Sequence, residues 1–434
     1  MDSYQVLKEK IENKQAKICI VGLGYVGLPL AVAFGQYGYF VYGFDTSSSR
    51  IEKLKNGEKY IVDVEAQTVL DLINKDKFLP TTAKSVLGDC DVVIICVPTP
   101  LRKVKIPDIS YVVKASKMIK KYLKEGQLVI LESTSFPTTT REVVLPVLRK
   151  SGLKEEEDFF LCFSPERVNP GDKDFPPTKI PKVVGGLSEE STQLSSALYS
   201  KIMEEVFTVS SPEVAETSKL LENTFRLVNI ALANEFAIVC DKLGISVWEV
   251  IEAAKTKPFG FMPFYPGPGT GGHCIPCDPL YLSWKAKKLG FKTKMIDLAS
   301  YINHFMPKYI IDKVEELLRE KEVALKESSV LVLGVTYKKD VKDLRESPSL
   351  DIIEQLQKRT KKLDFYDPLI PYLEIAGIHS KGIDFSADNL KNYDCIVIAT
   401  DHSDVDYDIL QKSAKFIFDT RNVYKHDFGN VKRL

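Results

Sequence analysis

The sequence predicts an α/β fold in which two Rossmann-like, doubly wound domains are joined by a central helical domain. Three observations predict it: short apolar runs alternate with longer amphipathic segments as far as about residue 210, the same alternation returns over about the last hundred residues, and the stretch between them is helical in pattern. Such alternation favours parallel sheets covered by helices on both faces. We expect domains over residues 1–210, 211–325 and 326–434.

Composition limits the classes of function. The chain has 434 residues, 44% of them hydrophobic, and its 59 basic and 59 acidic residues leave no overall basic field for nucleic acid or acidic membranes. The N-terminal segment MDSYQVLKEKIENKQ lacks the apolar core of a secretory signal, and no later stretch is apolar for about 18 residues. We expect a cytoplasmic protein with no nucleic-acid or membrane partner, no metal and no disulfide framework. Several of the cysteines lie in or beside apolar, strand-like runs, where cysteine is usually a small buried hydrophobe: Cys19, Cys90, Cys96, Cys162 and Cys395.

The strand candidates of the first domain are five apolar runs, KICIV, YFVYGFD, DVVIICV, QLVILES and FFLCF. The next region keeps apolar residues at three- and four-residue spacing and predicts a long helix from about Pro212, a break at Gly244, and a second helix that ends before Pro258. A loop rich in glycine and proline follows, and then another helical stretch towards residue 325. The last domain repeats the first pattern with SSVLVLGV, a helix from about Ser347, KLDFYDP, YDCIVIAT and AKFIFDTR.

A glycine-rich turn follows the first strand candidate. GLGYVG directly follows KICIV and opens an apolar helix, which is the context that this motif needs for binding a dinucleotide. Gly22 allows the tight turn, Gly24 lets the backbone approach a pyrophosphate, and Gly27 permits close packing of helix and strand. Tyr25 and Val26 are expected beside the phosphates.

An acidic residue about twenty positions further on predicts which dinucleotide binds. Asp45 ends the second strand candidate, where a carboxylate accepts hydrogen bonds from the ribose hydroxyls and repels a 2′-phosphate, so we expect NAD. Arg50 lies close enough to stack on adenine or contact ribose. Thr99 and Thr134 follow later strands, at the sheet edge where ligands bind, although isolated turn threonines are more often structural.

The strongest chemical signal is GPGTGGHCIPCDP, in which Cys274 follows a flexible glycine-rich loop. A reactive thiolate fits this setting, and Asp278 is close enough in sequence to handle a proton. His273, Cys274 and Cys277 have two weaker interpretations. A structural zinc site needs a fourth ligand from a second motif, and a redox CxxC pair normally opens a helix in a thioredoxin-like βαβ unit.

Two further segments carry polar candidates. Lys219, Asn223 and Arg226 recur at helical spacing, either as a solvated face or as a polar face that meets a ligand. In the second case Lys219 and Asn223 stabilise an oxyanion and Arg226 pairs with a phosphate or carboxylate. Glu166 in SPERVNPGD follows a strand candidate and is either a base or an ion-pair partner of Arg167.

These motifs resemble the UDP-glucose/GDP-mannose dehydrogenase family, and the resemblance extends from Lys17 to about Val423. It rests on GLGYVGLPLA, ESTSFP, SPERVNPG, the helical segment from Lys219 to Glu235, GPGTGGHCIPCDP and TYKKDVKDLRESPS, which occur in the order and approximate spacing of such enzymes. The resemblance implies two NAD-dependent oxidations at C6 of a UDP-sugar, with Cys274 forming first a thiohemiacetal and then a thioester that water hydrolyses to the uronate.

The resemblance also implies roles for individual residues. Lys219 and Asn223 would steady the oxyanion, Glu166, Thr134 and Asp278 would manage protons and water, and Arg345 would reach NAD. The remaining substrate contacts would come from Arg167, Val168, Arg226, Phe264, Tyr265, Gly267, Gly271 and Lys338, together with Glu166, Lys219 and Asn223.

Within that family, SPERVNPG and the cysteine loop are more similar to the UDP-N-acetylhexosamine 6-dehydrogenases than to the UDP-glucose enzymes, which tend to have serine and lysine where this chain has His273 and Cys277. We therefore expect UDP-N-acetylglucosamine as substrate, with UDP-N-acetylmannosamine or UDP-glucose as alternatives. The resemblance further implies a homodimer through the central helices and a uronate used in polysaccharide biosynthesis. Two other interpretations are a two-electron hydroxyacid dehydrogenase, which would not need Cys274, and a non-catalytic NAD-binding scaffold.

Overall fold

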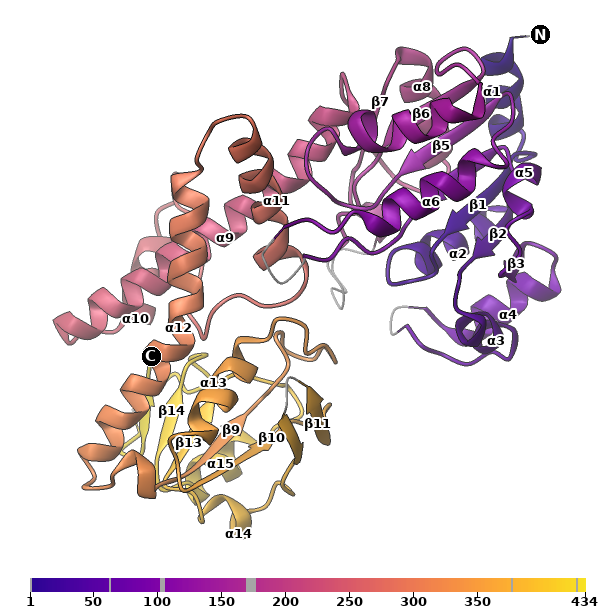
Figure 1. The fold of residues 1–434 in the computed structure, drawn as a ribbon. Helices are drawn as coiled ribbons and strands as arrows, with labels where there is room; N and C mark the ends of the chain where they lie inside the picture. Colours follow the sequence, from indigo (N-terminus) through magenta and orange to yellow (C-terminus); the bar gives the residue numbers. More distant parts are fainter. Residues whose placement is uncertain (1, 62–63, 102–105, 169–176, 376–377, 427) are drawn as a thin grey trace. The chain divides into compact units, whose positions relative to one another are not determined.

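The computed structural model describes residues 2–61, 64–101, 106–168, 177–375, 378–426 and 428–434 (Figure 1). The chain forms two compact units. The first contains Met1–Glu222 and Leu280–Gly290, and the second contains Asn223–Pro279 and Phe291–Leu434. Each unit is built around one predominantly parallel β-sheet, so the predicted α/β class is confirmed.

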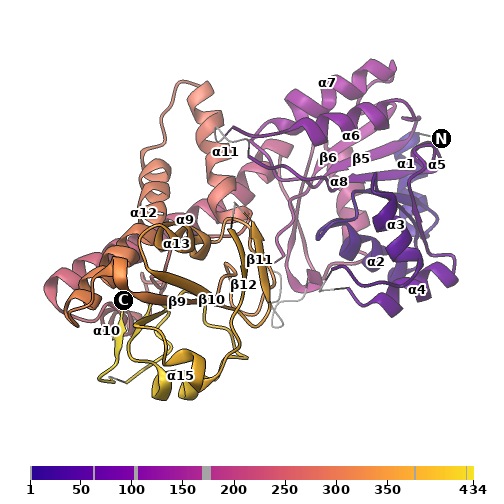
Figure 2. The same ribbon diagram turned by 60° about the horizontal axis from the view of Figure 1, so that its bottom comes forward.

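The first unit contains an eight-stranded sheet in the order β3-β2-β1-β4-β5-β6-β7-β8. Neighbouring strands run parallel except β6 and β7, which are antiparallel. Figures 1 and 2 show helices on both faces of this sheet. The strands are β1 (Lys17–Val21), β2 (Phe40–Phe44), β3 (Phe78–Thr81), β4 (Val92–Ile95), β5 (Gln127–Leu131), β6 (Phe159–Phe163), β7 (Lys182–Gly186) and β8 (Val206–Thr208).

Alternation along the central strand separates the two cores of this unit. Ile18 and Ile20 of β1 pack into one cluster of buried side chains, whereas Cys19 and Val21 pack into the other. Both faces are buried because side chains of a strand point alternately to opposite sides of the sheet. The surrounding helices are α1 (Ser3–Glu12), α2 (Gly27–Tyr37), α3 (Ser48–Lys55), α4 (Ala66–Asn74), α5 (Val86–Asp89), α6 (Ser110–Lys120), α7 (Leu145–Leu148) and α8 (Glu189–Tyr199).

The second unit contains a smaller parallel sheet in the order β10-β9-β13-β14-β15 and a separate antiparallel hairpin, β11–β12. The order around its central strand β9 repeats that around β1, as two Rossmann-like domains require. Its elements are β9 (Ser329–Leu333), α13 (Pro348–Gln357), β10 (Lys362–Tyr366), β11 (Tyr372–Ile375), β12 (Ile378–Lys381), α14 (Ala387–Leu390), β13 (Cys395–Ile398), α15 (Tyr407–Ser413), β14 (Ile417–Asp419) and β15 (Val431–Arg433).

The helical region follows the predicted pattern closely. The long helix α9 (Pro212–Leu243) ends just before Gly244, and α10 (Val247–Lys255) begins after Ser246, whose hydroxyl caps it. The expected single stretch towards residue 325 is two helices, α11 (Cys274–Lys288) and α12 (Lys294–Arg319), because the Leu289–Gly290 turn separates them. No helix in the described ranges is both long and apolar enough to cross a bilayer.

The nine strands that the sequence predicted are all present, as β1, β2, β4, β5, β6, β9, β10, β13 and β14. The strands that it missed are short or carry residues that are unfavourable in strands. β3 contains Pro80, β7 ends in two glycines, and β8 and β15 have only three residues each. Sheet neighbours, rather than local sequence, stabilise these segments.

Candidate active site

The glycine-rich turn after β1 has the backbone that a pyrophosphate needs. Gly22 has φ of +101°, and a Cβ at this position would lie 2.4 Å from the carbonyl oxygen of Cys96. A Cβ on Gly27 would lie 1.9 Å from the carbonyl oxygen of Gly22, so α2 packs tightly against the turn. A Cβ on Gly24, in contrast, would meet nothing within 4 Å, which leaves its backbone accessible to a ligand. The side chain of Tyr25 beside it is largely exposed.

Asp45, at the end of β2, organises the same turn. One carboxylate oxygen accepts the backbone N–H of Leu23 at 2.9 Å and pairs with Arg50 at 2.7 Å, and the other accepts the N–H of Ser47 at 2.9 Å. Its side chain is 6% exposed. The acidic residue at the second strand is thus fixed next to the glycine-rich turn, where a carboxylate can accept ribose hydroxyls.

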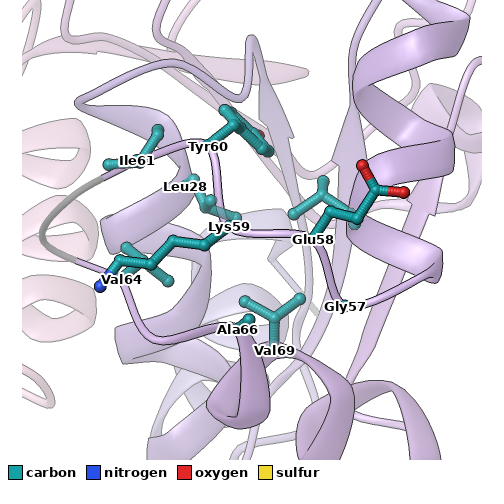
Figure 3. Close-up of a pocket in the computed structure, with 10 residues that line it drawn as sticks. Leu28, Gly57, Glu58, Lys59, Tyr60, Ile61, Val64, Ala66 and Val69 are labelled. Carbon is teal, nitrogen blue, oxygen red and sulfur yellow. The ribbon is translucent and has the colours of Figure 1, made fainter.

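Tyr60 is a residue of this region that sequence reasoning missed. Its hydroxyl donates to the carbonyl of Leu23 at 2.8 Å, and the Arg50 guanidinium lies 5.7 Å from the centre of its ring. Burial raises the pKa of the Tyr60 hydroxyl, so it remains a hydrogen-bond donor. Figure 3 shows Tyr60 in the segment that leaves α3, beside a small, mostly apolar pocket against Leu28 and Val69. No motif identifies such a tyrosine, because its partners are distant in sequence.

The two predicted threonines follow β4 and β5. Thr99 is buried, and its carbonyl oxygen accepts a hydrogen bond from the hydroxyl of Tyr281. Thr134 is partly exposed and follows Ser133, whose hydroxyl accepts the N–H of Val97 at 2.9 Å. The bond of Ser133 connects the loops after β4 and β5, and that of Tyr281 connects the loop after β4 to α11. Both lie at the carboxyl edge, where ligands of doubly wound sheets bind.

Glu166 follows β6 and lies beside a buried ion pair. One of its oxygens accepts the N–H groups of Arg167 and Val168, at 2.7 and 2.6 Å, and the other lies 3.8 Å from Nζ of Lys182. Lys182 in turn lies 3.0 Å from Glu132, with the two side chains 4% and 0% exposed. Burial alone would lower the pKa of Lys182, but the carboxylates of Glu132 and Glu166 raise it, so the lysine is charged.

Arg167, predicted as a substrate contact, is held by protein groups. Its guanidinium pairs with Glu222 on α9 at 2.7 Å and donates to the carbonyl of Pro181 at 2.6 Å. The rest of the SPERVNPGD motif, from residue 169, lies outside the described residues.

On α9, Lys219 and Asn223 are buried, whereas Arg226 is exposed. Asn223 donates from its amide nitrogen to a carboxylate oxygen of Asp278 at 2.6 Å. Asp278 is 1% exposed, on α11. The predicted polar face is therefore buried at its first two positions, and the described residues bring together Asn223 and Asp278.

Cys274 is the first residue of α11 and is exposed, whereas the other seven cysteines are buried. The N-terminus of a helix favours the negative charge of a thiolate. Cys277, three residues on, is different, because burial raises the pKa of its thiol to about 12. The pair therefore opens a helix, although not within a thioredoxin-like βαβ unit. Among the described residues, no cluster of His, Cys, Asp or Glu is arranged to hold a metal ion.

The loop that leads to Cys274 packs closely against the segment after β9. A Cβ on Gly271 would lie 2.5 Å from Cβ of Tyr337, and one on Gly272 would lie 2.8 Å from the Tyr337 ring. The N–H of Gly272 donates to the carbonyl of Arg345 at 2.9 Å, while the Arg345 guanidinium pairs with Asp343 at 2.6 Å. Glycine is required here because the two segments approach too closely for a side chain.

The remaining predicted substrate contacts lie in the same unit. The ring of Phe264 meets that of Phe225 edge to face, with 5.7 Å between ring centres, and Tyr265 stacks on Trp248 with 6.1 Å between ring centres. A Cβ on Gly267 would lie 2.7 Å from the guanidinium of Arg421, which is the last residue of the predicted run AKFIFDTR and lies just after β14. Sequence reasoning missed Arg421, although its place after a strand was a usable signal. Lys338 is half-buried in the segment after β9.

A glycine turn with open backbone and a carboxylate fixed beside it are the features of a dinucleotide-binding domain, as an NAD-linked oxidoreductase requires. Three family models match in succession: the NAD-binding domain over residues 16–203, the central domain over 213–304 and the UDP-binding domain over 331–426. The chain belongs to the UDP-glucose/GDP-mannose dehydrogenase family. It is an NAD-dependent nucleotide sugar dehydrogenase that acts on a UDP-sugar.

Known relatives include enzymes for two sugars. The chain is 39% identical to a UDP-N-acetyl-D-glucosamine 6-dehydrogenase of Pseudomonas aeruginosa, over 90% of this chain and 92% of that one. It is 35% identical to a UDP-N-acetyl-D-mannosamine dehydrogenase of Methanococcus vannielii, over 98% and 96%. Among solved structures, a UDP-D-ManNAc dehydrogenase from Pyrococcus horikoshii matches with a TM-score of 0.88 and 34% identity, over 96% of this chain and 98% of that one.

Proposed function

We propose that this enzyme oxidises the C6 hydroxyl of a UDP-N-acetylhexosamine to the carboxylate by a four-electron reaction with Cys274 as covalent nucleophile. The observation that carries the proposal is the position of Cys274, exposed at the first residue of α11. A thiol there can add to an aldehyde, and the same helix carries Asp278 one turn further on, bonded to Asn223. The hydroxyacid dehydrogenase interpretation gives no role to this thiol.

The proposed chemistry uses the chain's own groups as follows. NAD, when bound, accepts a hydride in each of the two oxidations. Sγ of Cys274 forms a bond to C6 of the aldehyde, and Lys219 and Asn223 stabilise the oxygen that becomes negative. After the second oxidation, water attacks the thioester, the C–S bond breaks, and the thiol and a carboxylate are released. Glu166, Thr134 and Asp278 are proposed to transfer the protons and orient the water, and Lys338, Phe264 and Gly267 to contact the substrate.

For the sugar, we propose UDP-N-acetylglucosamine. Support comes from the relative in Pseudomonas aeruginosa and from a second one in Salmonella typhi, 37% identical over 89% of this chain, which is also a UDP-N-acetyl-D-glucosamine 6-dehydrogenase. UDP-N-acetylmannosamine is the second candidate, because the relatives in Methanococcus vannielii and Pyrococcus horikoshii, the second of them also a solved structure, are named UDP-N-acetyl-D-mannosamine dehydrogenases.

The stoichiometry of NADH tests the function directly. The purified enzyme is incubated with NAD and, in separate reactions, UDP-N-acetylglucosamine, UDP-N-acetylmannosamine or UDP-glucose. We expect two NADH and one uronate per sugar, with UDP-N-acetylglucosamine preferred. One NADH per sugar would contradict the four-electron reaction, whereas a preference for UDP-N-acetylmannosamine would change only the sugar.

Paired cysteine variants test the nucleophile. Cys274→Ser should lose uronate formation, because a hydroxyl at this position does not form the hydrolysable thioester. Cys277→Val is the matched control, since it changes a buried cysteine of the same motif, and it should retain uronate formation. Uronate production by Cys274→Ser at the wild-type rate would contradict the mechanism.

We also propose three domains, over residues 1–210, 211–325 and 326–434, and a homodimer through the central helices. The matched family ranges support the division.

Support for the dimer comes from one face of α9, which carries large apolar side chains that are exposed and lie at helical spacing: Phe225, Leu232, Phe236, Val239 and Leu243. Light scattering of the wild type and of Phe236→Glu tests it, because a charge on this face should favour the monomer.

A further inference from the structure

His402 is a completely buried histidine in the loop after β13, and no motif in the sequence pointed to it. Its Nδ1 lies 3.0 Å from the backbone nitrogen of Asp340. Its Nε2 lies 3.0 Å from a carboxylate oxygen of Asp367 and 3.0 Å from the hydroxyl of Thr336. All the ring's polar atoms therefore face the segment after β9 or the end of β10.

The partners determine the protonation of the ring. A backbone N–H can only donate, so Nδ1 carries no proton, and the remaining proton lies on Nε2, which donates to Asp367. Burial opposes ionisation of Asp367, but hydrogen bonds from His402 and from the N–H groups of Val335 and Leu369 lower its pKa. His402 thus joins a carboxylate to a backbone N–H.

The segment that His402 holds, residues 336–340, is fixed at several points. The Thr336 hydroxyl donates to the carbonyl of Lys338 at 3.1 Å. Asp340 has φ of +58°, and its carboxylate accepts the N–H and the hydroxyl of Ser403 at 2.8 and 2.7 Å. Segment 336–340 therefore donates a hydrogen bond to the loop after β13, at His402, and accepts two from it, at Ser403. Of these groups, the imidazole of His402 is completely buried.

From this segment, one side chain reaches the cysteine loop. Tyr337 lies against Gly271 and Gly272, which directly precede His273 and Cys274, at distances that exclude any side chain on either glycine. A displacement of residues 336–340 would therefore displace the glycines as well. His402 is connected to Cys274 through Asp340, Tyr337 and the two glycines.

The first sheet offers a comparison at the equivalent position. In each sheet the central strand is followed by a glycine with positive φ, Gly22 or Gly334, and the neighbouring strand ends in an aspartate that accepts an N–H from that turn. Asp45 is paired there with Arg50, and Asp367 with the buried His402. Asp367 thus fixes the turn after β9 and the buried imidazole of His402 together.

We propose that His402 is a positioning residue that fixes the 336–340 segment, and through it both Lys338 and Cys274. The consequence for Cys274 in catalysis rests on the proposed function, but the effect on its thiol and on UDP binding does not. His402 does not contact the reacting atoms. Its role is to supply an acceptor for the N–H of Asp340.

Three variants of His402 separate this role from general support of the core. The amide oxygen of His402→Asn lies close to the position of Nδ1 and can still accept the N–H of Asp340, whereas His402→Gln places its amide near Nε2, and His402→Phe offers no polar atom. His379→Gln, in the exposed β11–β12 hairpin, is the control. For each full-length variant we would measure the rate of Cys274 alkylation by iodoacetamide, the Kd of UDP and Tm.

We expect all three His402 variants to lower Tm. We expect Gln and Phe to change the alkylation rate and the UDP Kd by about 2- to 30-fold, while Asn keeps both near the wild-type values. The proposal is overturned if all three variants change both quantities in proportion to Tm, or if none changes them. Failure of the wild type and all variants to form uronate would contradict only the proposed function, because neither the alkylation rate nor the Kd of UDP depends on turnover.

A second variant keeps the test decisive if His402→Phe does not fold. Tyr337→Ala removes the ring between the segment and the two glycines but leaves the buried imidazole in place. It should change the alkylation rate of Cys274 by a factor similar to that for His402→Gln, and the double variant should add little to either single effect. Independent, multiplying effects on the alkylation rate would contradict a shared path.

Discussion

The amide nitrogen of Asn223 on α9 lies 2.6 Å from a carboxylate oxygen of Asp278 on α11. Both side chains are buried, so this bond holds a carboxylate away from water and determines which way the amide of Asn223 points. The pair joins the helix of the predicted oxyanion residues to the helix that begins with the thiol.

Asn223→Ala tests this pair. We expect kcat to fall by about 100- to 1000-fold if the amide stabilises an oxyanion, and Tm to fall because a buried carboxylate loses a donor. Asn229→Ala is the matched control, since its amide bonds the carbonyl of Phe225 within the same helix. A loss of kcat as large in Asn229→Ala as in Asn223→Ala would contradict the assignment.

Asp45→Ala tests cofactor selection. The variant loses a ribose acceptor and releases both the N–H of Leu23 and the Arg50 guanidinium, so KM for NAD should rise by about 10- to 100-fold. The unpaired guanidinium should then improve the use of NADP. Steady-state kinetics with both cofactors measure the change. Adding Arg50→Ala should abolish the gain with NADP, and a gain that persists would show that Arg50 is not responsible.

Lys182→Met tests the buried ion pair. Removing the ammonium leaves the Glu132 carboxylate buried beside Glu166, which should destabilise the fold by about 3–5 kcal/mol. Neutralising the partner as well, in Lys182→Met with Glu132→Gln, should recover most of this loss. Thermal unfolding of the wild type and the two variants measures it. Equal Tm values for the single and double variants would mean that the pair is not coupled.

Titration of Glu216 should make the thermal stability of the protein depend on pH. Its buried carboxyl accepts the N–H groups of Thr138 and Thr140, but burial dominates and raises its pKa to about 7. The folded state binds this proton more tightly than the unfolded state does. Protonation of Glu216 therefore adds its full share to the free energy of unfolding below about pH 4.5, and this share is lost as pH rises through about 7. Glutamine does not titrate, so the Tm of Glu216→Gln relative to wild type should rise by about 5 °C between about pH 5 and about pH 8.

The control for this prediction is Glu213→Gln, which changes a partly exposed neighbour on the same helix that pairs with Arg141. The pKa of Glu213 is lowered rather than raised, although burial opposes this, so its contribution is retained at neutral pH. A Tm difference between Glu216→Gln and wild type that stays constant with pH would disprove the titration.

Sequence patterns predicted those parts of the fold and site whose residues are close in the chain. Gly22, Gly27 and Asp45 belong to one βαβ unit, and the break at Gly244 is a local event, so each was readable from spacing. Lys219 and Asn223 were readable as a polar face in an apolar helix. The patterns did not show that Arg226 is exposed. Helical spacing places Lys219, Asn223 and Arg226 on one face of the helix but does not say which segments of the fold cover that face.

Residues that depend on distant partners could not be predicted in this way. Lys182 lies in a short strand and meets Glu132 only because β7 belongs to the same sheet as β5. His402 faces Thr336 and Asp367 only once β9, β10 and β13 are adjacent. No local signal marks such residues, since the same side chains in the same local sequence would be exposed in another topology.

The contact of Tyr337 with Gly271 and Gly272 also constrains how this chain can diverge. A methyl group added to Gly271 would meet Cβ of residue 337 and the carbonyl oxygen of Glu346, and one added to Gly272 would also be strained by the φ of +79° there. Neither change becomes acceptable merely because Tyr337 is replaced by a smaller residue. The same limit applies to chimeras between relatives. A C-terminal half taken from another enzyme can replace this one only if its backbone near positions 337 and 346 leaves the same narrow space for the two glycines.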